Sequence, residues 1–413
     1  MEIKLRKIPR RFVYPHTILV GIFTLVLLFI SHNSLLHFMP ELFLCEFLPA
    51  VWVGVILLIN SFDSSIFKSK IGNISLLLAF SLIALALFNK YTNREIDFLM
   101  FVNSLILPII IALSLGRVEF SIDFQARLKI KKIIISFLIV NSIWAILERL
   151  LLYHLIPYVN TATEWIDKND YFRSSALWGH GLANSLVTTI IMLFVLFDES
   201  EKISKRLKLY TLGNIALICF NSRFFLLYSV VIFIVYVLYV IFINKAHKNV
   251  QQRKLLIIFS ILYLISFIIV VFYWGLSSRL TQMGIYDAES SAARIVIFDI
   301  FKYYSWNDFL FGINHSNVAI IMHSAGLNVI NENVWIIFMM RFGLIPLLLI
   351  LLVYFYFFKI VFRKYRRSHA LFICTSLLIC ISTFNSITTR EGYLAIFTLS
   401  AFVFQPTNKK IIL

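Results

Sequence analysis

The chain is dominated by apolar runs that are long enough, or nearly long enough, to cross the hydrocarbon core of a bilayer. A transmembrane helix needs about 20 largely apolar residues, and only helices or closed barrels satisfy the backbone there. Hydrophobic residues make up 60% of the chain and charged residues 14%, too few polar groups to cover a soluble domain. The candidate spans are 17–31, 42–60, 71–88, 98–115, 133–153, 182–198, 209–221, 224–243, 255–274, 333–356, 370–387 and 392–404.

These spans predict an all-α, polytopic membrane protein with about 12 transmembrane helices in a single domain, residues 1–413. With a cytoplasmic amino terminus, the segments on that side hold 27 of the 38 Lys and Arg residues. This asymmetry follows the positive-inside rule, so we expect both termini to be cytoplasmic. The net charge of +17 is explained by this topology, and nucleic acid is not expected as a partner. Residues 31–34 offer no small-residue cleavage site, so the first run is expected to be a retained span.

Two segments on the opposite side are longer than a turn, 154–181 and 275–332. In the larger one, 289–304 has apolar residues at helical spacing and predicts an amphipathic helix, with Ser290 or Ser291 as its cap. Arg294 would lie in the first turns of this helix, where anions are favoured. The alternative is an interfacial helix whose arginine binds lipid headgroups.

The shorter segment places Arg173 and His180 at the membrane surface ahead of the sixth span. The glycines on either side of His180 allow close backbone approach, and His180 is a candidate proton acceptor. A headgroup-anchoring arginine and a surface histidine are the alternatives. Glu332 is a carboxylate at the mouth of an apolar span, where a charge is costly unless it is paired or has a functional role. Its alternative role is an ion pair with Arg341 or Arg294.

Other charged residues in or near the spans include Glu148 and Arg149, for which structural pairing is the favoured explanation. The chain has no Walker-type phosphate loop, no dinucleotide-binding glycine pattern and no D-x-D pair. The four cysteines lie in apolar runs without metal-ligand spacing. We therefore expect no cofactor and no metal.

Several short motifs follow one another on the side opposite the termini, over about 173–356. They are Arg173 ahead of His180-Gly181-Leu182-Ala183-Asn184, the turn Asn221-Ser222-Arg223, Ser291-Ala292-Ala293-Arg294, Phe311-Gly312-Ile313, and Asn331-Glu332-Asn333 before Phe342-Gly343-Leu344-Ile345-Pro346. In order and sidedness this arrangement resembles the O-antigen polymerase and O-antigen ligase superfamily of bacterial membrane glycosyltransferases.

The resemblance implies a GT-C-like protein of the bacterial cytoplasmic (inner) membrane that acts on oligosaccharide repeat units linked through pyrophosphate to a polyprenyl lipid. It implies a metal-independent glycosyltransferase that polymerises a surface polysaccharide such as O-antigen of lipopolysaccharide, capsule or exopolysaccharide. The implied catalytic residues are Arg173, Arg294, Glu332 and His180, and the implied substrate-binding residues are Arg223, Arg279, Asn184 and Asn333. Arginines would stabilise the leaving pyrophosphate, and Glu332 or His180 would act as general base.

Membrane lipids, a flippase and a chain-length regulator are the other partners that such a polymerase would have. The ligase branch is similar but has a histidine at the place of Glu332, so the carboxylate favours a polymerase. Where the family has a glycine-rich motif, this chain has the single glycine Gly312. A ligase and a flippase or transporter remain as alternatives; transporters usually show internal repeats and helices broken at the midplane.

Overall fold

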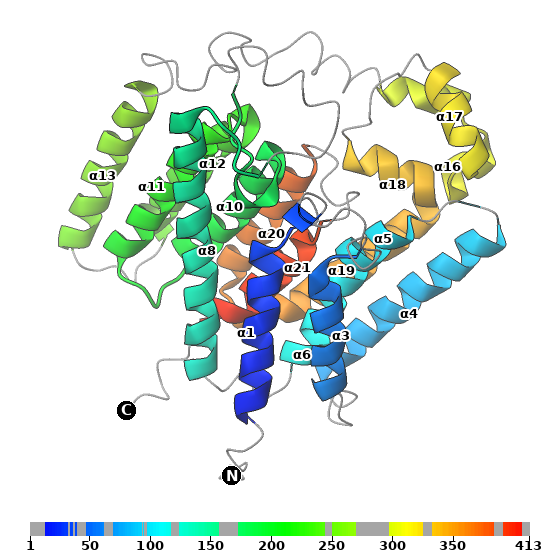
Figure 1. Ribbon diagram of the computed structural model, residues 1–413, viewed down its shortest axis with the longest axis horizontal. Helices are drawn as coiled ribbons and strands as arrows, with labels where there is room; N and C mark the ends of the chain where they lie inside the picture. The colour runs from blue at the N-terminus through cyan, green and yellow to red at the C-terminus, as the bar shows by residue number, and fades with distance from the viewer. Residues whose placement is uncertain are drawn as a thin grey trace.

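The structure is a computed structural model. It describes residues 13–31, 34–35, 38, 47–61, 69–92, 94, 97–116, 124–156, 172–243, 250–269, 297–324, 333–383 and 391–406. Over these residues the chain is helical, without a β-strand, as the apolar runs predict (Figure 1). The only strand-like pairing in this part of the chain is an isolated bridge between Arg94 and Asn314.

The helices follow the predicted runs. The first half contains α1 (Val13–Phe29), α3 (Pro49–Ser61), α4 (Lys70–Tyr91), α5 (Phe98–Met100), the π-helix η4 (Phe101–Ile106), α6 (Leu107–Leu115), α8 (Phe124–Leu151) and the short η6 (Ala176–Trp178). The middle contains α10 (Gly181–Leu196), α11 (Ile203–Cys219), α12 (Arg223–Leu238), η7 (Tyr239–Ile243) and α13 (Val250–Ile268). The last part contains η9 (Ile297–Tyr303), α16 (Trp306–Phe311), α17 (His315–Ser324), α18 (Val334–Phe342), α19 (Leu344–Val361), η10 (Phe362–Lys364), α20 (Arg367–Ile381) and α21 (Tyr393–Val403).

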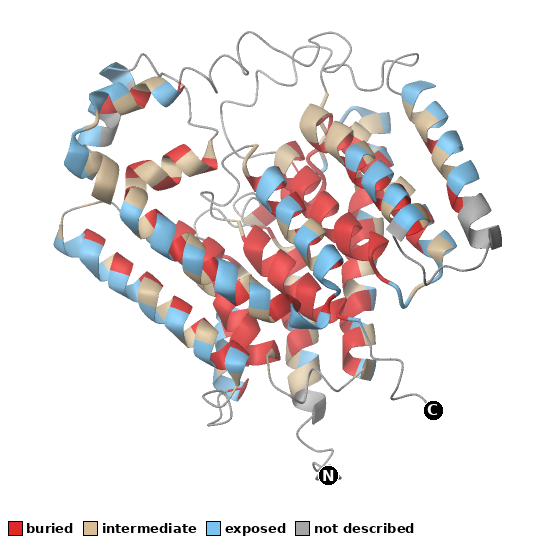
Figure 2. Ribbon diagram, turned by 180° about the vertical axis from the view of Figure 1, so that it is seen from behind, coloured by how far each residue is buried: buried red, intermediate tan, exposed pale blue. Residues whose placement is uncertain are grey.

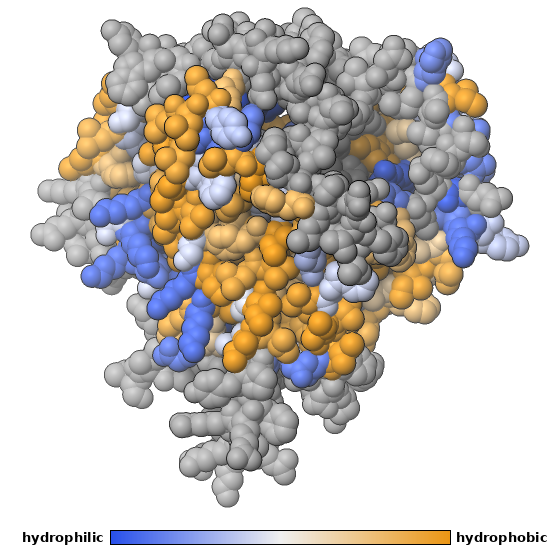
Figure 3. All heavy atoms as spheres, viewed as in Figure 1, coloured by the Kyte–Doolittle hydropathy of each residue, from blue (hydrophilic) through white to orange (hydrophobic). Residues whose placement is uncertain are grey.

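Five helical segments in the described part are long and apolar enough to cross a membrane: 70–91, 98–115, 124–151, 223–242 and 344–364. Several shorter helices are also apolar. Buried residues gather in the central helices, and exposed residues lie on the outer faces of the peripheral ones (Figure 2). Those outer faces carry large apolar side chains such as Phe80 and Leu371, and one face shows a broad band of them (Figure 3). Exposed apolar surface on this scale indicates a helical membrane protein.

The predicted tenth span, 333–356, is divided in the structure. Gly343 ends α18 with φ of +76°, and α19 begins at the next residue. A Cβ atom at Gly343 would lie 2.4 Å from the Gly312 backbone nitrogen, so the two glycines cross in close contact. Apolar residues continue on both sides of this point, but the helix does not, because the positive φ of Gly343 is incompatible with an α-helix.

The helix bundle has two distinct ends. Helices α1 and α8 run side by side in the same direction, since Gly21 lies beside Ile130 and Phe29 packs on Phe137. We call the end at which both begin the basal end, and the opposite end the apical end. The basal end also holds 198–206, 362–367 and 404–406, whereas the apical end holds 172–181, 220–223 and 333–343; they are the lower and upper ends in Figure 1.

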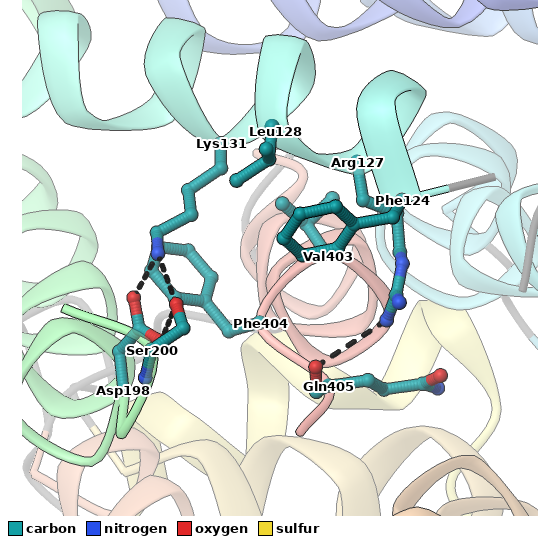
Figure 4. A pocket seen from close by; sticks show the side chains of 9 residues that line it. All are labelled: Phe124, Arg127, Leu128, Lys131, Asp198, Ser200, Val403, Phe404 and Gln405. Carbon is teal, nitrogen blue, oxygen red and sulfur yellow. Dashed lines mark hydrogen bonds and ion pairs between the residues drawn. The ribbon is translucent and has the colours of Figure 1, made fainter. Parts of the chain in front are cut away.

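Buried charges tie three chain segments together at the basal end (Figure 4). Lys131 of α8 forms an ion pair with Asp198 and another, at 3.3 Å, with Glu201. Its ammonium group also donates to the Ser200 hydroxyl at 2.9 Å. Arg127 donates to the carbonyl of Gln405 at 3.3 Å, just after α21. The start of α8 therefore anchors both the α10–α11 turn and the end of α21.

Basic residues are concentrated at the basal end. The cations there include Arg127, Lys129, Lys131, Lys132, Lys202, Lys205, Arg206, Lys208, Lys359, Arg363, Lys364, Arg366 and Arg367, against the acidic residues Asp198, Glu199 and Glu201. At the apical end the described cations are fewer and lie among Glu148, Asp97, Asp299, Asp308 and Glu391. The described cations are therefore concentrated at the end where α1 and α8 begin.

The described part of the large segment folds into a small unit at the apical end. Ile297 and Ile300 of η9, Ile313, Ile321 of α17, and Ile336 with Met340 of α18 form a second apolar core. Within the predicted amphipathic helix 289–304, the residues from Ile297 to Tyr303 form a 3₁₀-helix. The first part of that predicted helix lies outside the described residues.

Candidate functional site

The structure describes five of the eight predicted site residues. Arg279, Arg294 and Glu332 lie outside the described residues, and their predicted roles stay predictions. Arg173, His180, Asn184, Arg223 and Asn333 are described, and all five lie at the apical end. The first four lie on two chain segments in direct contact, whereas Asn333 begins α18.

A buried carboxylate of α8 holds the segment that carries Arg173. Glu148 is completely buried, and its Oε2 atom accepts hydrogen bonds of 2.8 Å from the backbone N–H groups of Ser175 and Ala176. The Ser174 hydroxyl also donates to Glu148. The second oxygen, Oε1, accepts from the backbone of Leu155 at 3.0 Å. The carboxylate is thus solvated by protein donors, which offsets the cost of burying its charge.

The same segment has further anchors on both sides of Arg173. Arg149 donates to the carbonyl of Phe172 at 2.6 Å, and the Phe172 ring stacks on His154 with 4.6 Å between centroids. Farther along, the buried Trp178 indole donates to the carbonyl of Leu28 at 2.8 Å. The backbone of residues 172–178 is therefore fixed to α8 and α1, which preorganises the side chains that it presents.

Arg173 and the turn Asn221-Ser222-Arg223 lie on adjacent backbones. The N–H of Ser174 donates to the carbonyl of Cys219 at 3.0 Å. At Gly181, a Cβ atom would lie 3.1 Å from the carbonyl oxygen of Phe220 and 3.8 Å from the Arg173 side chain. Glycine therefore permits the close approach that brings these segments together. The structure joins two motifs that lie almost fifty residues apart in the sequence.

His180 is the residue that precedes α10 and is partly exposed. Burial of its ring, together with the positive charge of Arg173, lowers the pKa of His180 to about 4. The imidazole is therefore neutral near pH 7 and can accept a proton, but the low pKa makes it a weaker base than an ordinary histidine. Asn184 bonds the backbone on both sides of the turn, because its Nδ2 atom donates to the carbonyls of Ser175 and His180.

Backbone strain is concentrated around this cluster. The non-glycine residues with positive φ in the described part are Leu152, Ala176 and Asn221, with φ of 50°, 41° and 50°. Leu152 follows the helix of Glu148, Ala176 bonds to Glu148, and Asn221 belongs to the turn beside Arg173. Such conformations are costly and gather where a function requires them.

Arg223 is the first residue of α12, a helix of 16 residues, and Ser222 precedes it as its N-cap. The Ser222 hydroxyl is buried and has no hydrogen-bond partner among the described residues. The amide oxygen of Asn184 is likewise buried without such a partner there. A helix start with an available hydroxyl and an adjacent guanidinium is suited to bind an anion.

Asn333 has a structural role in the described part of the chain. Its side-chain oxygen accepts from the backbone N–H groups of Trp335 and Ile336 at 3.0 and 3.4 Å and so caps α18. The substrate-binding role predicted for Asn333 stays a prediction. At the other end of α18, the guanidinium of Arg341 lies 3.9 Å from the carboxylate of Asp97. The alternative ion pair between Arg341 and Glu332 involves a residue outside the described part of the chain.

Glu148 is the residue of this cluster that sequence reasoning missed. Structural pairing is the favoured explanation in the sequence, yet the partners that Glu148 holds in the site segment are backbone amides and hydroxyls 26 to 28 positions later. A carboxylate within an apolar run, near a loop rich in small residues, is the signal that could have found it.

The chain matches no protein-family model, no curated protein and no solved structure in the comparisons made.

Proposed function

We propose that the protein is a bacterial polysaccharide polymerase that joins polyprenyl-pyrophosphate-linked repeat units at its apical end, on the outer face of the cytoplasmic membrane. One observation carries the proposal: Arg173, His180 and the Asn221-Ser222-Arg223 turn meet on a backbone that is anchored by the buried Glu148. The order of motifs over 173–356 supplies the chemical class by resemblance.

Charge distribution supports the proposed orientation. The basal end carries a dense set of cations around Arg127, Arg206 and Arg367, and the positive-inside rule assigns such an end to the cytoplasm. In this orientation the termini are cytoplasmic and the apical cluster faces the periplasmic or external side. About 12 spans and a GT-C-like topology are part of the proposal.

The chemistry follows from the charges of the cluster. A hydroxyl of the acceptor unit attacks the anomeric carbon of the donor, and the bond from that carbon to the pyrophosphate oxygen breaks. The lipid pyrophosphate leaves with the electron pair, and Arg173, supported by Arg223, stabilises the negative charge that develops. Neutral His180 takes the hydroxyl proton, with Glu332 as the alternative base. Attack from the side opposite the leaving group inverts the anomeric centre.

Ligation of the glycan to another acceptor and flipping of the lipid-linked unit are the competing functions. A genetic experiment separates them: Arg173→Ala is introduced into a strain whose surface polysaccharide depends on this chain. A polymerase predicts loss of long chains while single repeat units still reach the surface. Units trapped inside indicate a flippase, and long chains left on the carrier lipid indicate a ligase. Unchanged glycan with the variant present in the membrane contradicts the proposal.

A further inference from the structure

A long apolar groove lies apart from the apical cluster. It has a volume of about 850 Å³ and runs between α19 and α20, with α21 as its floor. Side chains of Leu351, Tyr354 and Phe358 form one wall, and those of Cys374 and Leu378 form the other. Leu371 lies on the open side and is 71% exposed, so the groove faces the surroundings of the bundle rather than its interior.

The groove extends along most of the membrane thickness. Its lining begins with Trp335 at the apical end and reaches Arg367 at the basal end. Helix α19, which forms one wall, has 18 residues and is therefore about 27 Å long. Because the hydrocarbon core is about 30 Å thick, hydrocarbon chains can lie along the whole wall.

The two ends of the groove differ in charge. Lys359, Arg363 and Arg367 line its basal mouth, and all three are exposed. Among the described residues, Arg363 and Arg367 have no acidic partner, whereas the neighbouring Arg366 lies 3.3 Å from Glu199. An apolar groove that ends in cations complements an amphiphile with hydrocarbon chains and an anionic headgroup.

We propose that this groove is a binding site for an anionic phospholipid of the cytoplasmic leaflet. The acyl chains lie between α19 and α20, and the phosphate group contacts Arg363 and Arg367, with Lys359 beside them. The site rests on the membrane orientation proposed above, but not on the glycosyltransferase activity. The bound phospholipid would hold α20 against α19 at the basal end, away from the candidate site at the apical end.

The test uses the full chain purified in a mild detergent and incubated with phosphatidylglycerol or phosphatidylcholine; native mass spectrometry measures the lipid that is retained. We expect the wild-type protein to retain phosphatidylglycerol over phosphatidylcholine by about tenfold. Arg363→Gln/Arg367→Gln loses that preference. Lys132→Gln/Lys208→Gln removes two exposed basal cations outside the groove lining and leaves the preference unchanged.

A second variant tests the hydrocarbon part of the site. Cys374→Trp fills the groove without changing its charge, and we expect it to reduce retention of both lipids in monodisperse protein. Equal retention of the two lipids by wild type, or an unchanged preference in the double Arg variant, overturns the proposal. So does cross-linking of Leu371→Cys between two copies at high yield, because a second copy would then cover the groove. None of these readouts requires catalysis, so failure here leaves the polymerase proposal standing.

Discussion

The carboxylate of Glu148 accepts a hydrogen bond of 2.8 Å from the backbone N–H of Ser175, two residues after Arg173. This contact joins a membrane helix to the segment that carries the candidate site. The carboxylate has further donors in Ser174 and Ala176, so three consecutive residues depend on one buried charge. The position of Arg173 is therefore set by α8.

Glu148→Gln should weaken this anchor while keeping the side-chain size. In glutamine an NH2 group replaces one of the two acceptor oxygens, and this donor would face the backbone N–H donors of the segment. We expect the free energy of unfolding to fall by about 3 kcal/mol. Thermal unfolding of the purified protein measures this. Glu199→Gln breaks an exposed ion pair with Arg366 and serves as control, with an expected cost below about 1 kcal/mol. Equal stability of the two variants would contradict the anchoring role.

The pH dependence of the reaction reports on His180. Its pKa is lowered to about 4, so the neutral base persists well below pH 6.5. We expect the rate of polymerisation to stay level on acidification and to fall only as the pH approaches about 4. An inflection near pH 6.5 is the opposite result. His180→Gln should lower the rate by about 10²-fold or more, and a rate within a few-fold of wild type would assign the base to Glu332.

The same pKa shift links the protonation of His180 to folding. The unfolded state takes up the proton near pH 6.5 and the folded state only near pH 4, so acidification favours unfolding. The contribution of His180 to stability is complete above pH 6.5 and is lost progressively as the pH falls toward 4. Unfolding measured across this interval should show a shallower decline in His180→Gln than in wild type. Parallel declines would contradict the shift.

Gly343 should not tolerate a side chain. With φ of +76° and a Cβ position 2.4 Å from the Gly312 nitrogen, Gly343→Ala meets backbone that cannot move aside. We expect a loss of about 2 kcal/mol or more in the free energy of unfolding. Gly21→Ala in α1 is the control, because its Cβ would meet only the side chains of Ile130 and Ile133 at ordinary contact distances of 3.8 and 3.9 Å. If Gly343→Ala were as stable as Gly21→Ala, the close glycine crossing would be wrong.

The basal charges should behave as a buried pair. Lys131→Met leaves the Asp198 carboxylate buried without its ion pair, and we expect a cost of about 3–5 kcal/mol. Removing both charges in Lys131→Met/Asp198→Leu should recover part of that loss. Denaturation of the single and double variants measures the coupling. A double variant that shows the full sum of the single losses would exclude a direct energetic link between these residues.

The all-helical fold and the positions of the helices could be predicted from the sequence, because each apolar run must satisfy its own backbone in lipid. The break at Gly343 was not predicted, although Arg341 before it and Pro346 after it are signals of a helix end. A single glycine in an apolar stretch is also compatible with an unbroken membrane helix. The cause of the break is the contact with Gly312, whose approach no local pattern reveals.

The sequence points to the cationic residues of the candidate site, but not to the hydrogen bonds of Glu148 that hold them in place. Arg173, His180 and Arg223 stand out because charged and titratable residues are few at the ends of the apolar runs that are predicted to lie opposite the termini. The partners of Glu148 are backbone groups, which carry no sequence signal, and the approach of Gly181 to Phe220 depends on how α10 and α11 pack. Arg173, His180 and Arg223 are candidates that the sequence predicts, and the packing of the helices decides how these residues are held.

Reconstitution with purified lipid-linked repeat units tests the central claim most directly. The measurement is the length of glycan formed by wild type, by Arg173→Ala and by Lys90→Ala, which removes an exposed apical cation outside the cluster. We predict long chains from wild type and Lys90→Ala, and a rate lower by about 10²–10³-fold for Arg173→Ala. Chains of equal length and rate from folded Arg173→Ala protein would contradict the assignment of the apical cluster as the catalytic site.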